Sequence, residues 1–207
     1  MFELEIAILA AIITAFIGPI LVTRYKFYLE SKRKKEDPVI SSIKSNLLID
    51  EQLEEIKDEL KSCRVWVSQF HNGGNFYPTG TSIQKFSVFY EHLKPGTAPI
   101  GDIYSNIPVS LFTKPFMYMY ENKEILIPNY PKYDKFGLTT FAEGTQSKSS
   151  YMFALFSLKE EFIGTLGVEY CTRAKNLNED QLEYLRDKSI TIGTLLSTYL
   201  YKTTKTK

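Results

Sequence analysis

An uncharged run near the N-terminus is the feature that most limits what this chain can become. Residues 6–23 carry no charged side chain, and six basic residues follow them: Arg24, Lys26, Lys32, Arg33, Lys34 and Lys35. A helix needs about 20 apolar residues to cross the hydrocarbon layer of a membrane, so this run lies at the short end of that range. The sequence therefore predicts one transmembrane helix within residues 1–24.

The charges beside this run predict its orientation. A cleaved signal peptide carries basic residues before its apolar segment, whereas Glu3 and Glu5 precede the run here. A signal peptide and a buried core helix stay open as alternatives to a retained span. Because basic flanks tend to remain in the cytoplasm, we expect a single-pass protein of the cell membrane with its N-terminus outside and its C-terminal domain cytoplasmic. The basic cluster also predicts contact with the anionic surface of the lipid bilayer.

The rest of the chain has the composition of one folded domain. We expect a basic juxtamembrane linker or helix over residues 25–44, a domain over 45–202 and a frayed tail over 203–207. Once the N-terminal charges are set aside, basic and acidic residues balance, and this balance argues against a nucleic-acid partner. The two cysteines, Cys63 and Cys171, show neither metal-ligand spacing nor a disulfide framework.

Hydrophobic periodicity and turn residues predict an α+β fold. Strands are expected at 64–70, 85–92, 124–127, 150–158 and 162–171, with a turn at 71–74 and an irregular segment at 128–146. Helices are expected up to about residue 62, over 107–120 with an interruption near Pro115, and after Asn178, a favourable N-cap. This order predicts an antiparallel sheet with the terminal helices on one face.

Apolar stripes run along both terminal helices. The first includes Ile49, Leu53, Ile56 and Leu60 at spacings of three and four, and the second includes Leu182 and Leu196. Two interpretations stay open: each stripe packs on its own domain, or the six residues form the seam of a homodimer.

Three segments resemble the GAF family. Residues 150–170 are similar to its strand, short turn and Ile-Gly-x-Leu-x-Val strand; residues 178–185 resemble the start of its closing helix, and residues 124–128 its short strand before the pocket loop. The likeness covers roughly residues 45–200. It implies a GAF-like fold with a small-molecule pocket on the sheet face opposite the terminal helices. Candidate pocket residues are His71, Tyr90, Phe116, Tyr120, Tyr133 and Phe141; alternatively, the aromatic residues fill the core and nothing binds.

The residues that carry cofactor attachment in GAF domains can be looked for one by one in this sequence. Bilin-binding GAF domains attach their chromophore through a cysteine, commonly beside a histidine, but neither cysteine here adjoins His71 or His92. The sequence contains no recognisable catalytic or metal-binding motif, so we expect no enzyme activity, metal or cofactor. The prediction is a membrane-anchored GAF-like module that senses a small ligand or signals through a separate protein partner. The alternatives are a scaffold without a ligand at the cytoplasmic membrane face and an enzyme of unknown type using His71.

Overall fold

The computed structural model describes residues 5–6, 13–32 and 37–204, and its contacts divide the chain into residues 1–41 and 42–207. The first unit contains a π-helical turn, η1 (Ile13–Ile17), and α2 (Gly18–Lys32). Within the described ranges, no helix combines the length and apolar character needed to cross a bilayer. The membrane span stays a prediction from the sequence, and residues 7–12 of that span lie outside the described ranges. So do Arg33, Lys34 and Lys35 of the basic cluster.

The second unit is built on a six-stranded antiparallel sheet. Its strand order is β3-β2-β1-β6-β5-β4. The strands are β1 (Arg64–Asn75), β2 (Ser82–Leu93), β3 (Ile107–Pro108), β4 (Glu124–Ile127), β5 (Ser149–Phe156) and β6 (Phe162–Tyr170). In the centre of the sheet, β1 pairs with β6, with Arg64 opposite Glu169. The predicted α+β fold and antiparallel sheet are confirmed.

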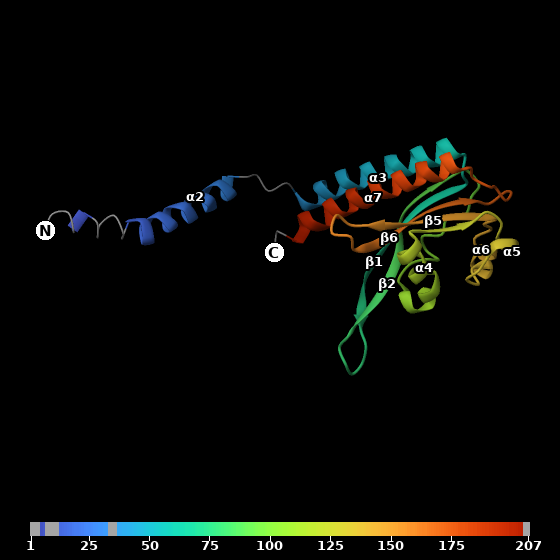
Figure 1. The fold of residues 1–207 in the computed structure, drawn as a ribbon, viewed down its shortest axis with the longest axis horizontal. Coiled ribbons are helices and arrows are strands. Elements are labelled where there is room, and N and C mark those ends of the chain that lie inside the picture. Colours follow the sequence, from blue (N-terminus) through green and yellow to red (C-terminus); the bar gives the residue numbers. More distant parts are fainter. Residues whose placement is uncertain (1–4, 7–12, 33–36, 205–207) are drawn as a thin grey trace. The chain divides into compact units, whose positions relative to one another are not determined.

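The two long helices α3 (Pro38–Leu60) and α7 (Glu179–Thr204) lie side by side over one face of the sheet (Figure 1). Their apolar stripes are buried in the domain's own core, against strand residues such as Val65, Val67 and Phe153. The buried stripe residues include all six of the proposed dimer seam: Ile49, Leu53, Ile56, Leu60, Leu182 and Leu196. That seam must be corrected, because these side chains cover the sheet and present no surface to a second copy.

Local interactions fix the start and the pairing of α7. The Asn178 side chain accepts a hydrogen bond from the Gln181 amide at 2.9 Å, and the Gln181 side chain accepts one from the Asn178 amide at 3.2 Å, so the predicted N-cap is part of a reciprocal capping box. Lys188 on α7 donates hydrogen bonds to Gln52 and Glu55 on α3.

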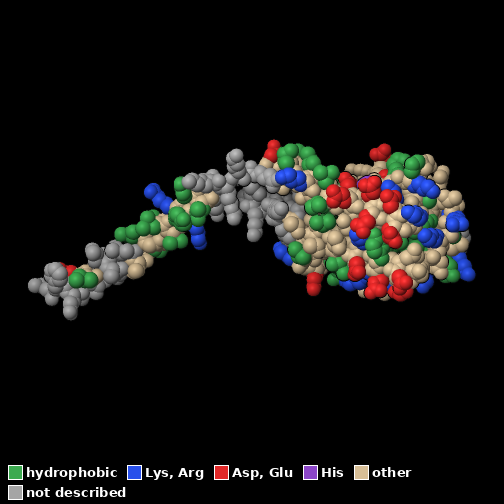
Figure 2. Space-filling view, turned by 90° about the horizontal axis from the view of Figure 1, so that it is seen from above, with side chains coloured by type: hydrophobic (Ala, Val, Ile, Leu, Met, Phe, Trp, Pro, Cys, Tyr) green, Lys and Arg blue, Asp and Glu red, His purple; other side chains and the backbone are tan. Residues whose placement is uncertain are grey.

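Figure 2 looks down on these helices and shows acidic side chains gathered over them. Exposed acidic residues of the two helices include Glu51, Glu54, Glu55, Asp58, Glu183 and Asp187.

Shorter helices cover the opposite face of the sheet (Figure 1). These are the 3-10 turn η2 (Val109–Phe112), α4 (Thr113–Asn122), α5 (Tyr130–Tyr133) and α6 (Thr139–Gly144). The helix expected over 107–120 with an interruption near Pro115 is present as η2 followed by α4. Because α4 begins at Thr113, Pro115 lies in its first turn, where the missing N–H removes no helical hydrogen bond. One expectation was wrong here. The segment 128–146, expected to be irregular, contains α5 and α6.

The β1–β2 hairpin extends beyond the sheet (Figure 1). The turn predicted at residues 71–74 is wrong, because β1 continues to Asn75 and the chain reverses over residues 76–81. Gly73 and Gly74 lie within β1 and not in a turn. The pairing register shifts between Asn72 and Asn75, and Gly74 has a φ of 99°, which only glycine adopts without strain.

Candidate functional site

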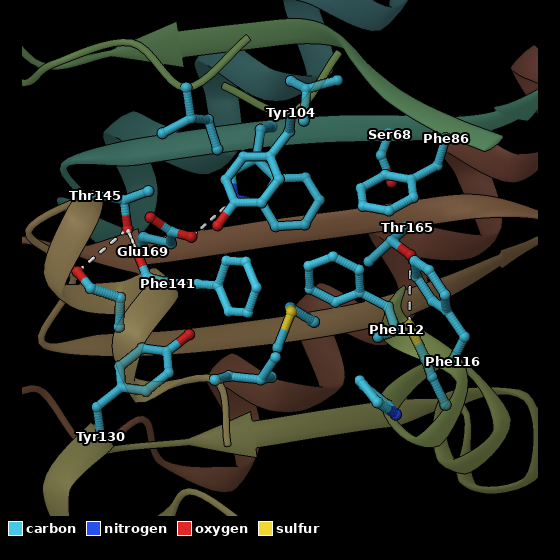
Figure 3. Close-up of a pocket in the computed structure, with 18 residues that line it drawn as sticks. Ser68, Phe86, Tyr104, Phe112, Phe116, Tyr130, Phe141, Thr145, Thr165 and Glu169 are labelled. Atoms are coloured by element: carbon cyan, nitrogen blue, oxygen red, sulfur yellow. Dashed lines mark hydrogen bonds between the residues drawn. The ribbon is translucent and has the colours of Figure 1, made fainter. Parts of the chain in front are cut away.

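A cavity of about 70 Å³ lies between the sheet and the short helices (Figure 3). Strands β1, β2, β5 and β6 supply one wall, and η2, α4 and α6 supply the other. Its apolar lining includes Phe86, Phe112, Phe116, Met119, Leu138 and Phe141. Polar atoms reach the same space from Ser68, Tyr104, Tyr130, Thr145, Thr165 and Glu169. An apolar space with a few polar groups is the usual form of a small-molecule site.

Strand alternation explains how one sheet supplies both a core and a cavity. Successive side chains of a strand point to opposite faces. On β1, Val65 and Val67 face α3 and α7, whereas Trp66 and Ser68 face the cavity. On β6, Leu166 and Val168 belong to the helix-covered core, whereas Thr165 and Glu169 line the cavity. The same two central strands therefore contact both layers.

Edge-to-face aromatic contacts form the apolar end of the cavity. The Phe86 ring lies 5.3 Å from that of Phe112 and 5.1 Å from that of Phe116, both nearly perpendicular. The Phe112 ring also lies 4.9 Å from the ring of Phe141 on α6. These contacts join β2 to the helices that cover the cavity, so the apolar end has walls on both sides.

A buried ionic cluster forms the polar end. The fully buried Arg64 side chain pairs with Glu169 through Nη1, and its Nε lies 3.3 Å from Oε1 of Glu91. Glu169 also accepts hydrogen bonds from Ser147 and, at 3.1 Å, from Nε1 of Trp66. Glu91 accepts one from the Ile100 amide at 2.9 Å. Two carboxylates thus share one guanidinium, which leaves the polar end with an excess of negative charge.

Two tyrosines face this negative charge. Burial, with the neighbouring Glu169 carboxylate as a second cause, raises the pKa of Tyr104 to about 12 and also raises the pKa of Tyr130. Both phenols are therefore neutral near pH 7. Figure 3 shows the Tyr104 ring directed toward Glu169. Because its hydroxyl makes no hydrogen bond to any residue that the structure describes, it can donate to or accept from a bound molecule.

The structure separates the six candidate pocket residues. Phe116 and Phe141 line the cavity. Tyr120 and Tyr133 are 49% and 45% exposed and do not line it. Tyr90 lies on the helix-covered face, where its hydroxyl donates to Asn46 at 2.8 Å.

His71 also lies outside the cavity, with its Nε2 2.8 Å from the Ser87 hydroxyl and its ring against Phe89. The sequence reasoning missed Arg64, Trp66 and Glu169. The signal for the two charged residues was their place in the strands: Arg64 opens β1, and Glu169 is the last residue but one of β6.

Comparisons with known proteins support the fold. No family model matches the chain, and no curated protein does either. Solved structures do match. The third GAF domain of Slr1393 from Synechocystis sp. PCC6803 superposes with a TM-score of 0.60 and 13% identity, covering 79% of this chain and 99% of that one. The PixJ GAF domain from Thermosynechococcus elongatus gives a TM-score of 0.61 and 10% identity, covering 78% and 90%.

The fold is GAF-like. A third similar structure is that of JSC1_58120g3 in its far-red absorbing dark state with bound biliverdin IXa. It superposes with a TM-score of 0.57 and 12% identity, covering 79% of this chain and 97% of that one. At such identities the likeness concerns the fold alone.

The cavity residues of this GAF-like domain do not fit a covalently bound bilin. Neither Cys63 nor Cys171 is among the lining residues, and the space of about 70 Å³ is far below the roughly 300–1,000 Å³ of sites for drug-sized ligands. In the described part of the chain, no three His, Cys, Asp or Glu side chains form a group suited to a metal ion. The cavity is therefore a candidate site for a compact, non-covalent ligand.

Proposed function

We propose that this GAF-like domain is a sensing module whose cavity binds a small, largely apolar or aromatic molecule with one hydrogen-bonding group. The observation that carries the proposal is the cavity itself, with an aromatic lining at one end and the Glu169 carboxylate and Tyr104 hydroxyl at the other. The aromatic end accommodates the ligand body. The excess negative charge at the polar end favours a ligand group that donates hydrogen bonds, such as an amine or an N–H heterocycle.

The size of the cavity limits the ligand. A space of about 70 Å³ lies well below the roughly 300–1,000 Å³ of ordinary small-molecule pockets, so the cavity admits only a compact ligand without movement of its walls. A larger ligand requires α4 and α6 to move away from the sheet. Binding would then displace elements on one face of the sheet, which is a suitable origin for a signal.

The output of the proposed sensor is a separate protein partner that contacts α3 and α7. Strands β1 and β6 contact the cavity with one set of side chains and these two helices with the other, so the sheet links the two layers. The exposed acidic residues of α3 and α7 favour a partner with a basic surface. They also disfavour nucleic acid on that face, because like charges repel.

Attachment to the cell membrane is a further part of the proposal and rests on the sequence alone. The uncharged run of residues 6–23 and the basic residues after it support one span, an external N-terminus and a cytoplasmic domain.

A homodimer is also part of the proposal, but the six buried residues first expected to form its seam cannot be its interface. The exposed apolar side chains Ile43, Leu47 and Leu48 of α3 are better placed to contact a second copy.

Thermal unfolding tests the proposed ligand site. The purified full-length chain is screened against small aromatic and heterocyclic amines, and a ligand that binds only the folded state should raise the Tm. Ala142→Leu, at a buried lining position on α6, should fill the cavity and abolish the increase. Glu143→Leu, at the exposed neighbouring position, introduces the same side chain outside the cavity and should leave the increase unchanged.

The same experiment separates the alternatives. If no ligand raises the Tm, the domain is better described as a scaffold without a ligand. If a ligand stabilises Ala142→Leu as much as the unmodified chain, the cavity is not its site. The enzymatic alternative gains no support from the geometry, because His71 lies outside the cavity and contacts Ser87.

A further inference from the structure

The fold brings together the chain's only two cysteines, which lie 108 positions apart in the sequence. Cys63 immediately precedes β1, and Cys171 immediately follows β6. Because these strands pair antiparallel with Arg64 opposite Glu169, the start of one strand lies beside the end of the other. The backbone amide of Cys171 donates a hydrogen bond to Sγ of Cys63 at 3.0 Å. The two thiols also interact with each other as hydrogen-bonding neighbours, so their side chains start from adjacent positions, as a disulfide requires.

The surroundings of the two thiols differ. Burial opposes ionisation of Cys63, but the amide groups of Cys171 and Thr172 and the Thr172 hydroxyl, 3.9 Å from Sγ, outweigh it, so the pKa of Cys63 is lowered. Burial raises the pKa of Cys171 to about 12. The thiolate is the nucleophilic form of cysteine, and Cys63, although only 7% exposed, forms it more readily than Cys171. Cys171 is partly exposed and lies where it can act second.

We infer that Cys63 and Cys171 form a reversible redox pair that closes into an intramolecular disulfide on exposure to a hydroperoxide. The Cys63 thiolate attacks the terminal oxygen of the peroxide, the O–O bond breaks, and the alkoxide leaves and is protonated to an alcohol (to water for hydrogen peroxide). The sulfur is then a sulfenic acid. The Cys171 sulfur attacks it, the S–O bond breaks, and the hydroxide leaves as water with the proton of Cys171. One hydroperoxide is reduced, and two thiols are oxidised to one disulfide.

This site is independent of the proposed ligand. It nevertheless lies beside the cavity, because Arg64 follows Cys63 directly and Glu169 precedes Cys171 by two positions. A disulfide would join the two strands at the point where they hold the buried ion pair. Its detection needs no ligand, so failure of the ligand proposal leaves it unaffected, and the reverse also holds.

Thiol chemistry on the full-length chain tests the pair. After treatment of the reduced protein with hydrogen peroxide, we expect both thiols to become unreactive, the intact mass to fall by about 2 Da through loss of two hydrogens, and dithiothreitol to reverse both changes. Peptide mapping of the oxidised protein should recover a cross-link between Cys63 and Cys171. Non-reducing electrophoresis should show no disulfide-linked oligomer.

Two variants assign the roles of the thiols. Cys171→Ala should accumulate a sulfenic acid on Cys63 that dimedone traps, whereas Cys63→Ala should show at most weak labelling. Any of three results would overturn the inference. These are two free thiols that persist in the peroxide-treated wild-type chain, dimedone labelling of Cys171 alone, or disulfides that form only between chains. Because peptide mapping uses the unmodified chain, the test does not depend on how well the variants fold.

Discussion

Gly167 lies beneath the indole ring of Trp66, so close that a Cβ on Gly167 would lie 2.1 Å from Cε2 of the ring. The two residues are directly opposite in the β1–β6 pairing. The missing side chain therefore allows the Trp66 ring to lie flat over the sheet and its Nε1 to reach Glu169.

Gly167→Ala should destabilise the domain by about 1–3 kcal/mol, because the indole must move out of a packed site. Denaturant unfolding measures the change. Gly144→Ala is the matched control, since a Cβ there meets nothing within 4 Å, and it should change stability by less than about 0.5 kcal/mol. Equal effects of the two substitutions would contradict this role of Gly167.

Gly193→Ala tests the approach of α7 to the sheet. Helix propensity alone would favour alanine by about 1 kcal/mol. However, a Cβ on Gly193 would lie 2.5 Å from the backbone oxygen of Phe156 on β5, and a backbone atom cannot rotate away. We expect the steric effect to prevail and the free energy of unfolding to fall. An increase in stability would show that α7 can move away from β5 at little cost. Thr194→Ala, at the exposed neighbouring position, is the control.

Arg64→Met should cost about 3–5 kcal/mol, because it leaves the buried Glu169 and the partly buried Glu91 carboxylates without their guanidinium. Adding Glu169→Gln should recover part of this loss, since one of the uncompensated charges is then removed. Urea unfolding of the single and double variants measures the coupling.

Arg186→Met provides the contrast for Arg64. Arg186 pairs with Glu124 and Glu179, but its side chain is 39% exposed, so its removal should cost less than about 1 kcal/mol. A similar loss for the two arginines would argue against a special role for the buried cluster.

Asp134→Asn should weaken the segment that leads into α6. The Asp134 carboxylate accepts hydrogen bonds from the Thr139 amide at 2.6 Å and hydroxyl at 2.7 Å and from the Phe136 amide at 3.0 Å. Partial burial opposes ionisation, but these bonds outweigh it and hold the pKa of Asp134 below its ordinary 3.8. The carboxylate therefore stabilises the fold fully above that pH, and the stabilisation is lost as the pH falls through the lowered value.

Near pH 7 the Asp134→Asn variant should be less stable by about 1 kcal/mol. Its difference from the unmodified chain should shrink as the pH falls below 3.8, because protonation removes the same charge. Unfolding curves at several pH values check this. A difference that stays constant down to the acid limit would show that the charge is not responsible.

The features that the sequence predicts well are local. The hairpin of β5 and β6 follows from two mostly apolar runs on either side of a short polar turn, and the start of α7 from the cap at Asn178. The stripe from Ile49 to Leu60 correctly indicated an amphipathic helix. It did not indicate what covers the stripe, because a sheet and a second helix bury the same pattern equally well.

The features that the sequence does not predict depend on long-range pairing. Arg64 and Glu169 meet only through the β1–β6 register, across 105 positions. Cys63 and Cys171 become neighbours for the same reason. Tyr90 and Phe116 looked equivalent as aromatic residues, but they lie on opposite faces of the sheet. Alternation from Phe86 and Val88 would direct Tyr90 into the cavity, and the register shift opposite Val67 and Ser68 turns it to the helix-covered face instead.

The pairing of β1 with β6 also has a consequence for biosynthesis. The first strand to be made lies in the middle of the sheet beside the last, so a ribosome must release most of the domain before the centre can close. A nascent or truncated polypeptide that ends before residue 162 exposes one edge of β1, with its backbone groups open to other chains. Shielding of that edge by a chaperone is therefore most useful late in translation.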